Sequence, residues 1–143
     1  MTVNDILLHK GGQVITIEPT ATLAAAVRML VQQRIGALLV TGADHRIVGI
    51  ISERDIVHGL ADHGAALLSL NVGKMMTRRV VTCELSDSVD QLMAEMTNRR
   101  IRHFPVVQDG RLYGIVSIGD VVKNRLDEVE FEARSLRSFI AGA

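Results

Sequence analysis

The sequence predicts an α/β fold built from two copies of one small repeat, with a longer helix at the C-terminus. Residues 14–41 align with residues 80–107 at an offset of 66, and residues 44–57 align with residues 109–122 at an offset of 65. In both copies, segments with helical spacing of apolar residues alternate with short extended runs. Such self-similarity over most of a chain indicates an internal duplication.

Each copy is expected to contain a strand, a helix, two strands and a second helix. The first helix is predicted by apolar residues at i, i+3, i+4 and i+7, namely Leu23, Ala26, Val27 and Leu30, and then Val89, Leu92, Met93 and Met96. Hydroxyl groups near residues 20–22 and 86–88 are expected to cap these helices at their N-termini. Arg99 and Arg100 are expected to end the helix of the second copy.

Two short apolar runs follow each of these helices and predict a hairpin. The runs are 37–40 and 47–51 in the first copy, and 104–107 and 112–116 in the second. Gly42 and Asp44 mark the first turn, and Asp109 with Gly110 marks the second. A further helix is expected to open after Ser52 and after Ser117.

The expected division places the first repeat at residues 1–70, the second at 71–126, and a helical extension at 127–143. An apolar stripe predicts that the last helix continues to about Phe139: Val122, Leu126, Val129, Ala133, Leu136 and Ile140. This stripe must be covered, either by the chain itself or by a second copy, and we expect a homodimer. A membrane-surface helix is disfavoured because the polar face is partly acidic, with Asp127, Glu128, Glu130 and Glu132.

Composition excludes several classes of protein. The 143 residues are 48% hydrophobic, and no apolar run approaches the roughly 18 residues of a membrane span. The N-terminus does not show the pattern of a secretory signal, so a cytoplasmic location without membrane insertion is expected. Sixteen basic and sixteen acidic side chains cancel, which gives no reason to expect a polyanionic partner. The single cysteine, Cys83, lies among apolar residues and is expected to be a buried hydrophobic side chain.

The sequence shows no catalytic or nucleic-acid-binding motif. It has no His-Glu-x-x-His, no Cys-x-x-Cys and no Gly-x-x-x-x-Gly-Lys phosphate loop, so we expect a protein that is not an enzyme. Nucleic-acid binding through the arginines is disfavoured because no aromatic residues for base stacking are interleaved with Arg78, Arg79, Arg99, Arg100 and Arg102.

The repeated segments resemble the CBS domain family, in which two repeats related by pseudo-twofold symmetry form a Bateman module. The resemblance, to a stand-alone bacterial type, covers roughly residues 3–125. It rests on the segments Gly49-Ile50-Ile51-Ser52-Glu53-Arg54-Asp55, Gly114-Ile115-Val116-Ser117-Ile118-Gly119-Asp120, Val72-Gly73-Lys74-Met75-Met76-Thr77 and Ile101-Arg102-His103-Phe104-Pro105-Val106-Val107. It implies a regulatory module that binds AMP, ADP, ATP, S-adenosylmethionine or NAD in clefts between the repeats. Disc-like homodimers and a regulated enzyme or transporter as partner are also implied.

The chemistry of the repeated segment suits a nucleotide. A serine at the start of a helix places its hydroxyl and nearby N–H groups where an anion is favoured. An aspartate three residues later offers carboxylate oxygens to two ribose hydroxyls.

By position, the resemblance implies two sets of ligand-binding residues. The first set is Val14, Ile15, Ala37, Leu38, Ser52, Arg54 and Asp55. The second set is Val80, Val81, Arg102, His103, Phe104, Pro105, Ser117 and Asp120. Glu53 and Arg54 separate the serine and aspartate of the first repeat, whereas Ile118 and Gly119 do so in the second, so the charge near a phosphate differs between them. Lys123 is a further candidate cation near the second set.

Two alternatives remain open. A serine followed three residues later by an aspartate also caps a helix without any ligand. A module that only mediates protein–protein contacts or dimerisation, with no small-molecule ligand, is therefore the second hypothesis. Arg102 and Lys123 could likewise be solvated surface charges, and His103 a packed histidine.

Overall fold

The structure is a computed structural model that describes residues 1–142. It contains two compact units. Residues 13–81 form the first-repeat unit, and residues 1–12 join the residues from Thr82 onward in the second-repeat unit. The expected division placed residues 1–70 in the first repeat, whereas here residues 1–12 pack with the second repeat and residues 71–81 pack with the first.

The first-repeat unit is a three-stranded sheet with helices packed against it. In chain order its elements are β1 (Thr16–Ile17), α2 (Leu23–Gln33), β2 (Ala37–Thr41), the 3-10 helix η1 (Ala43–His45), β3 (Ile47–Ser52), α3 (Glu53–His63), the 3-10 helix η2 (Gly64–Ser69) and α4 (Val72–Met75). Strand β2 lies in the middle, parallel to β1 and antiparallel to β3. Its first residue, Ala37, pairs with Ser52, the last residue of β3. The register therefore fixes where Ser52 leaves the sheet.

All five residues of β2 are buried, as expected for a central strand. The core of this unit combines Leu38, Val40 and Ile51 of the sheet with Leu23, Ala26 and Leu30 of α2. Leu67 and Val72 close it from the segment that follows α3. A rigid core directly beneath the end of β3 thus holds the start of α3 in place.

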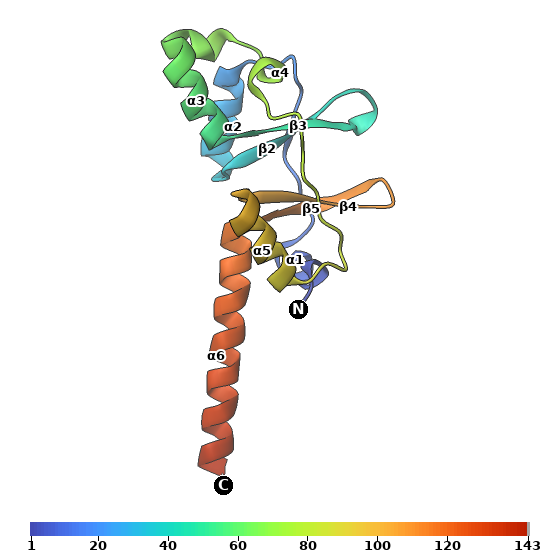
Figure 1. Ribbon diagram of the computed structural model, residues 1–143, viewed down its shortest axis with the longest axis vertical. Coiled ribbons are helices and arrows are strands. Elements are labelled where there is room, and N and C mark those ends of the chain that lie inside the picture. Colours follow the sequence, from blue (N-terminus) through green and yellow to red (C-terminus); the bar gives the residue numbers. More distant parts are fainter. Residues whose placement is uncertain (143) are drawn as a thin grey trace. The chain divides into compact units, whose positions relative to one another are not determined.

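The second-repeat unit has a two-stranded sheet and three helices. Its elements are α1 (Val3–Lys10), α5 (Val89–Arg99), β4 (His103–Gln108), β5 (Arg111–Ser117) and α6 (Ile118–Gly142) (Figure 1). Strands β4 and β5 are antiparallel, and His103 pairs with Ser117 as Ala37 pairs with Ser52. The hairpin turn has Asp109 at φ 53° and Gly110 at φ 76°, the left-handed pair that a two-residue turn of this type requires.

The expected first strand of the second repeat is reduced to one bridge. Cys83 pairs with Val106 in parallel, as Ile17 pairs with Val40, but no counterpart of the Thr16–Leu39 pair forms. The residue equivalent to Leu39 is Pro105, which has no backbone N–H to donate to a neighbouring strand. The prediction of a strand here was wrong for that reason.

Helix α1 was not predicted. It packs on the second-repeat unit, where Val3, Ile6 and Leu7 are buried. The amides of Val3 and Asn4 donate to the carbonyls of Asp87 and Leu85 at 2.9 and 3.0 Å. The second repeat therefore supplies the surface that stabilises the N-terminal helix.

Both predicted first helices are confirmed, with their caps. Thr22 caps α2 and Ser88 caps α5 through their side chains, which accept hydrogen bonds from the N–H groups of Ala25 and Gln91. Helix α5 ends at Arg99, as expected, with Arg100 in the left-handed region at φ 55°.

Helix α6 runs to Gly142, slightly beyond the expected end near Phe139. Only Val121 and Asn124 are buried along it, and its C-terminal part extends away from the strands of its own unit (Figure 1). Within residues 1–142, none of the helices combines the length and the apolar composition needed to cross a bilayer.

Candidate functional site

The turn from β3 into α3 brings Ser52 and Asp55 together. The amide and hydroxyl of Ser52 donate to Oδ2 of Asp55 at 2.9 and 3.1 Å, and the amide of Asp55 donates back to Oγ of Ser52 at 3.3 Å. This is a reciprocal capping box at the start of α3. The other carboxylate oxygen, Oδ1, accepts a hydrogen bond from the hydroxyl of Thr77 at 3.0 Å.

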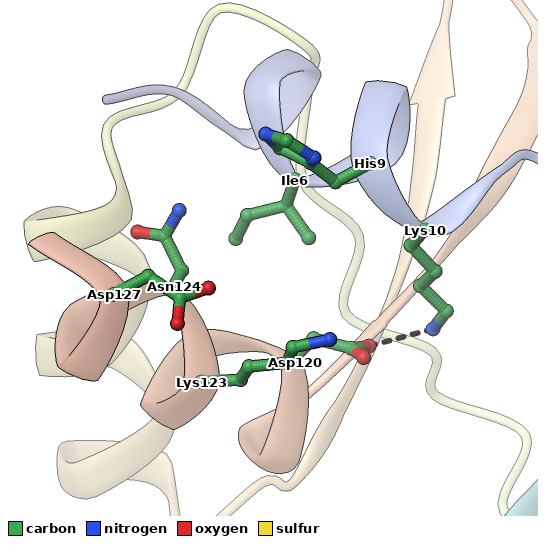
Figure 2. Close-up of a pocket in the computed structure, with 7 residues that line it drawn as sticks. All are labelled: Ile6, His9, Lys10, Asp120, Lys123, Asn124 and Asp127. Atoms are coloured by element: carbon green, nitrogen blue, oxygen red, sulfur yellow. Dashed lines mark hydrogen bonds and ion pairs between the residues drawn. The ribbon is translucent and has the colours of Figure 1, made fainter.

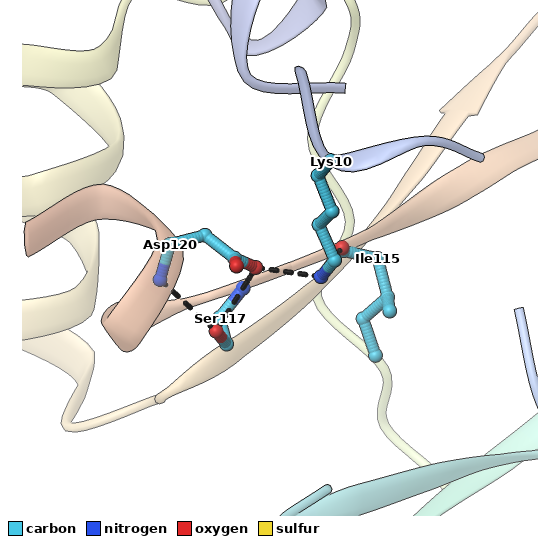
Figure 3. Close-up of polar contacts among 4 residues, drawn as sticks. All are labelled: Lys10, Ile115, Ser117 and Asp120. Atoms are coloured by element: carbon cyan, nitrogen blue, oxygen red, sulfur yellow. Dashed lines mark hydrogen bonds and ion pairs between the residues drawn. The ribbon is translucent and has the colours of Figure 1, made fainter. Parts of the chain in front are cut away.

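The second repeat builds the same turn from Ser117 and Asp120. The amide and hydroxyl of Ser117 donate to Oδ2 of Asp120 at 2.8 and 2.9 Å, and the amide of Asp120 donates to Oγ of Ser117 at 3.2 Å. Lys10, at the end of α1, adds a further contact (Figure 3). Its ammonium lies 2.6 Å from Oδ2 of Asp120 and donates to the carbonyl of Ile115 at 2.7 Å. The two repeats therefore differ in what holds the aspartate: a hydroxyl in the first and an ammonium in the second.

The electrostatics of Asp120 follow from these contacts. Burial of the carboxyl group opposes its ionisation, but hydrogen bonds from Lys10 and Ser117 outweigh burial and hold the pKa of Asp120 below its usual value. The carboxylate is thus ionised at neutral pH and can accept hydrogen bonds.

The backbone at both helix starts is partly used within the chain. The amide of Glu53 donates to the carbonyl of Gly36 at 3.0 Å, and the amide of Ile118 donates to the carbonyl of Arg102 at 2.8 Å. The third amide of each helix donates to the serine hydroxyl. At least two of the first three helix amides in each repeat are therefore engaged, which limits how many could reach a phosphate.

A pocket of about 230 Å³ lies between α1 and α6 in the second-repeat unit (Figure 2). Its lining is mostly polar: Ile6, His9, Lys10, Asp120, Lys123, Asn124 and Asp127. Asn124 is only 9% exposed, and its Oδ1 has no hydrogen-bond partner among the described residues. Of these lining residues, Asp120 and Lys123 were expected from the sequence to lie near a ligand. The pocket itself was not predicted, because α1 was not predicted. The apolar spacing of Val3, Ile6 and Leu7 was the available signal.

The other members of the first expected set differ in burial, and the sheet register pairs one of them with Ser52. Ala37 pairs with Ser52 across the sheet, and Val14 and Ile15 are half-buried. Leu38 has no exposed surface and packs in the core of the unit. Arg54 is exposed.

The second expected set is divided between the two units. Val80 and Val81 belong to the first-repeat unit and are half-buried, whereas the other members belong to the second-repeat unit. His103 is half-buried and pairs with Ser117, and Arg102 is exposed. Phe104 and Pro105 are buried.

A second, apolar pocket of about 410 Å³ lies between α2 and α3. Its lining is Val27, Leu30, Val31, Arg34, Glu53, Ile56 and Val57. Val31 and Val57 are 72% and 62% exposed, so the two helices present an uncovered apolar face. A face of this kind is typical of a surface that contacts another protein.

Cys83 is buried, as expected, and the structure gives it no reactive character. Burial, followed by the charge of Asp87, raises the pKa of its thiol to about 12. Among residues 1–142, no three histidine, cysteine, aspartate or glutamate side chains are grouped so as to hold a metal ion.

Curated relatives of this chain carry the same repeats along most of its length. The mitochondrial CBS domain-containing protein CBSX3 of Arabidopsis thaliana is 34% identical over 149 residues, which cover 99% of this chain and 72% of the relative. Hypoxic response protein 1 of Mycobacterium tuberculosis is 31% identical over 104 residues, 72% of each protein.

Solved structures show the same fold. The CBS-domain containing protein ATU1752 from Agrobacterium tumefaciens is 46% identical with a TM-score of 0.86, over 87% of this chain and 99% of that one. The CBS domain pair of protein MJ0100, solved in complex with 5′-methylthioadenosine and S-adenosyl-L-methionine, is 28% identical with a TM-score of 0.79, over 90% of this chain and 98% of that one. The family model of the CBS domain matches residues 3–62 and 72–127. Two matches that together span most of the chain show that it belongs to the CBS domain family, as a tandem pair of CBS repeats.

Proposed function

We propose that this CBS pair is a regulatory module that binds an adenosine-containing ligand through its two serine–aspartate turns. Proteins built on this pair are generally regulatory and non-catalytic. The observation that carries the proposal is the repeated turn, in a chain whose structural neighbour MJ0100 was solved with 5′-methylthioadenosine and S-adenosyl-L-methionine. The ligands we propose are AMP, ADP, ATP or NAD.

The turns suit a ribose because an ionised carboxylate accepts about four hydrogen bonds and adjacent sugar hydroxyls supply two. In the first repeat a ribose hydroxyl would replace the hydroxyl of Thr77 on Oδ1 of Asp55, an exchange between similar groups. In the second repeat the ammonium of Lys10, a stronger donor, already shares Oδ2 of Asp120 with the amide and hydroxyl of Ser117, so this carboxylate is a weaker acceptor for a ribose hydroxyl. We therefore propose that the first turn binds uncharged nucleosides more tightly than the second. A Lys10 displaced from Asp120 would be able to pair with a phosphate.

Roles for the other expected ligand-binding residues are assigned from their positions in the two repeats. We propose that Val14, Ile15 and Ala37 contact the base at the first turn, with Arg54 near a phosphate. At the second turn we propose that His103 contacts the base, with Arg102 near a phosphate. The role of Val80 and Val81, which belong to the first-repeat unit, stays a prediction from the sequence. A ligand of this kind acts as an energy or adenylate signal only if it binds two arrangements of the module unequally, which a partner enzyme or transporter could then detect. The cytoplasmic location stays a prediction from the sequence.

Isothermal titration calorimetry against AMP, ADP, ATP, NAD and 5′-methylthioadenosine tests the proposal. We expect at least one to bind, and the isosteric change Asp55→Asn to weaken binding at the first turn by about tenfold, since one charge-assisted acceptor is lost. Asp62→Asn is the matched control, because Asp62 is an exposed residue of the same helix and the charge change is identical. A bound ligand at 100 times its Kd should also stabilise the fold by roughly 2.7 kcal/mol.

The second candidate function is an interaction module without a ligand. It is favoured by the capping boxes, which already satisfy both aspartates, and by the apolar face between α2 and α3. In this case we propose that the face contacts a second copy of the chain as a homodimer. If no adenosine compound binds at millimolar concentration while the protein still self-associates, this function replaces the first.

A further inference from the structure

Helix α6 carries an apolar stripe with a strict heptad spacing. Its members follow one another at steps of four, three, four, three and four residues: Val122, Leu126, Val129, Ala133, Leu136 and Ile140. The members form two series that each repeat every seven residues, 122, 129 and 136 and then 126, 133 and 140, and a seven-residue repeat of apolar positions is the pattern of a left-handed coiled coil. The same spacing also occurs on a surface helix that packs on its own domain, so the two cases are distinguished by whether the stripe is covered.

The described chain leaves this stripe uncovered. Its five large members are between 49% and 66% exposed, and the buried residues of α6 are Val121 and Asn124, on another part of the helix. The match to the CBS family model ends at residue 127, so most of the stripe lies beyond the conserved module. None of residues 1–142 covers the stripe, and a second copy of the chain would bring an identical stripe to it.

The charged residues that flank the stripe identify the second molecule and its direction. In the heptad, the "a" positions of the stripe are residues 126, 133 and 140, and the "d" positions are residues 122, 129 and 136. Arg125 and Glu132 each precede an "a" position, and Glu130 and Arg137 each follow a "d" position. In a parallel, in-register pair of helices, a residue of the first kind faces the residue five positions later on the other helix. Arg125 would then face the partner's Glu130, and Glu132 would face the partner's Arg137. Both are pairs of opposite charge. Because the two helices are related by a twofold axis, each pair occurs twice in the dimer.

The antiparallel arrangement fails the same comparison. If the six apolar layers are matched with the helices reversed, Glu130 and Glu132 each face their own counterpart, and Lys123 faces Arg137. These contacts all join like charges, which disfavour pairing. The sequence of α6 is therefore complementary to itself in one direction only.

We propose that α6 forms a parallel two-stranded coiled coil with α6 of a second copy of this chain. The proposal shares with the second candidate function the expectation that the chain self-associates, but it places the contact on α6 and not on the face between α2 and α3. It does not depend on a ligand. The apolar stripe supplies the affinity. The flanking charges choose the direction, since exposed ion pairs contribute little strength. To form the interhelical pairs, Arg125 gives up its contacts with Glu128 at 3.2 Å and Asp90 at 3.6 Å, and Glu130 gives up its contact with Arg134 at 3.8 Å. The cost is small because each of these contacts has at least one side chain that is more than half exposed. Phe131 lies on the opposite face and takes no part.

Cysteine crosslinking in the full chain tests the orientation. Cys83 is buried, so a cysteine introduced on α6 is the accessible thiol. In the parallel pair the Leu136→Cys thiols meet, and mild oxidation should convert most of the protein into a covalent dimer. In the matched antiparallel pair, Leu136 lies level with Leu126, about 15 Å along the axis from its own counterpart at 1.5 Å per residue. Ser135→Cys, on the outer face, is the control and should crosslink at least tenfold more slowly.

Charge exchange, measured by analytical ultracentrifugation, provides the second test. Arg137→Glu should weaken self-association by roughly tenfold, since two attractive pairs become repulsive. Adding Glu132→Arg to it should restore the association. Arg134→Glu changes the net charge equally on the outer face and should leave the association within about twofold.

The outcomes separate the two proposals. Equal crosslinking of both cysteine variants, or failure of Glu132→Arg to rescue Arg137→Glu, overturns the coiled coil. A dimer that persists without either effect assigns self-association to another face, such as that between α2 and α3, and overturns only the coiled coil. A monomeric wild-type protein overturns both, while the calorimetric test of ligand binding is unaffected.

Discussion

The ammonium of Lys10 lies 2.6 Å from Oδ2 of Asp120, a residue 110 positions later in the chain. The contact joins the end of α1 to the start of α6 and is the third hydrogen bond to one carboxylate oxygen (Figure 3). Its counterpart in the first repeat is the hydroxyl of Thr77 on Asp55. The duplicated turns have thus diverged in the donor that supplements the serine, which is a hydroxyl on Oδ1 in the first repeat and an ammonium on Oδ2 in the second.

This contact should make stability depend on pH in a defined direction. The folded state holds the pKa of Asp120 below its ordinary value of 3.8, so the ion pair stabilises the protein above that value and loses its effect as pH falls through the lower folded pKa. We expect Lys10→Met to lower the free energy of unfolding at pH 7 by at most about 1 kcal/mol, because both groups are partly exposed.

Urea unfolding at pH 7 and at stepwise lower pH checks this prediction. The difference between the wild type and Lys10→Met should be constant near neutrality and shrink below about pH 4. Lys123→Met, which removes a charge from the same pocket, is the control, and should not show this dependence. A difference that grows toward acid pH would contradict the assignment.

The capping boxes predict a cost for the serines that is independent of any ligand. Ser52→Ala and Ser117→Ala should each lower the free energy of unfolding of the apo protein by about 1 kcal/mol, because each leaves the third amide of a helix without its acceptor. Thermal unfolding without nucleotide measures it. Ser69→Ala, in an exposed position, is the control. Unchanged stability of both variants would show that these serines are retained for binding alone.

The elements that were predicted are those with a local signal that occurs twice. The helices that begin after Thr22 and Ser88 and the hairpins that end at Ser52 and Ser117 carry their spacing and caps within a few residues. The shortening of the first strand of the second repeat to one bridge at Cys83 could be predicted only by comparing the repeats, because Pro105 stands where the first repeat has Leu39. The pairing of Lys10 with Asp120 has no local signal, because it depends on where α1 packs.

A left-handed residue at the end of α2 offers a stabilising substitution. Arg34 ends the helix at φ 54°, a conformation that costs a residue with a Cβ atom roughly 1–2 kcal/mol and costs glycine little. Arg34→Gly should therefore raise the free energy of unfolding by about 0.5–1 kcal/mol, after the greater flexibility of glycine in the unfolded chain is subtracted. Arg34→Ala is the matched control, since it removes the same side chain but keeps the strain. Equal effects of the two variants would assign any change to the side chain and not to the backbone.

Asn124 predicts a stabilising change of a different kind. Its Oδ1 is buried without a hydrogen-bond partner among the described residues, and a buried acceptor left unsatisfied costs about 1–3 kcal/mol. Asn124→Leu keeps a similar volume and removes that acceptor, so chemical denaturation should show a gain of about 1 kcal/mol. Asn124→Asp is the control that keeps the size and the acceptor atoms while adding a charge, and it should not stabilise the protein. A loss of stability in Asn124→Leu would instead show that the carbonyl is hydrogen-bonded in solution, by water or by a molecule held in the pocket between α1 and α6.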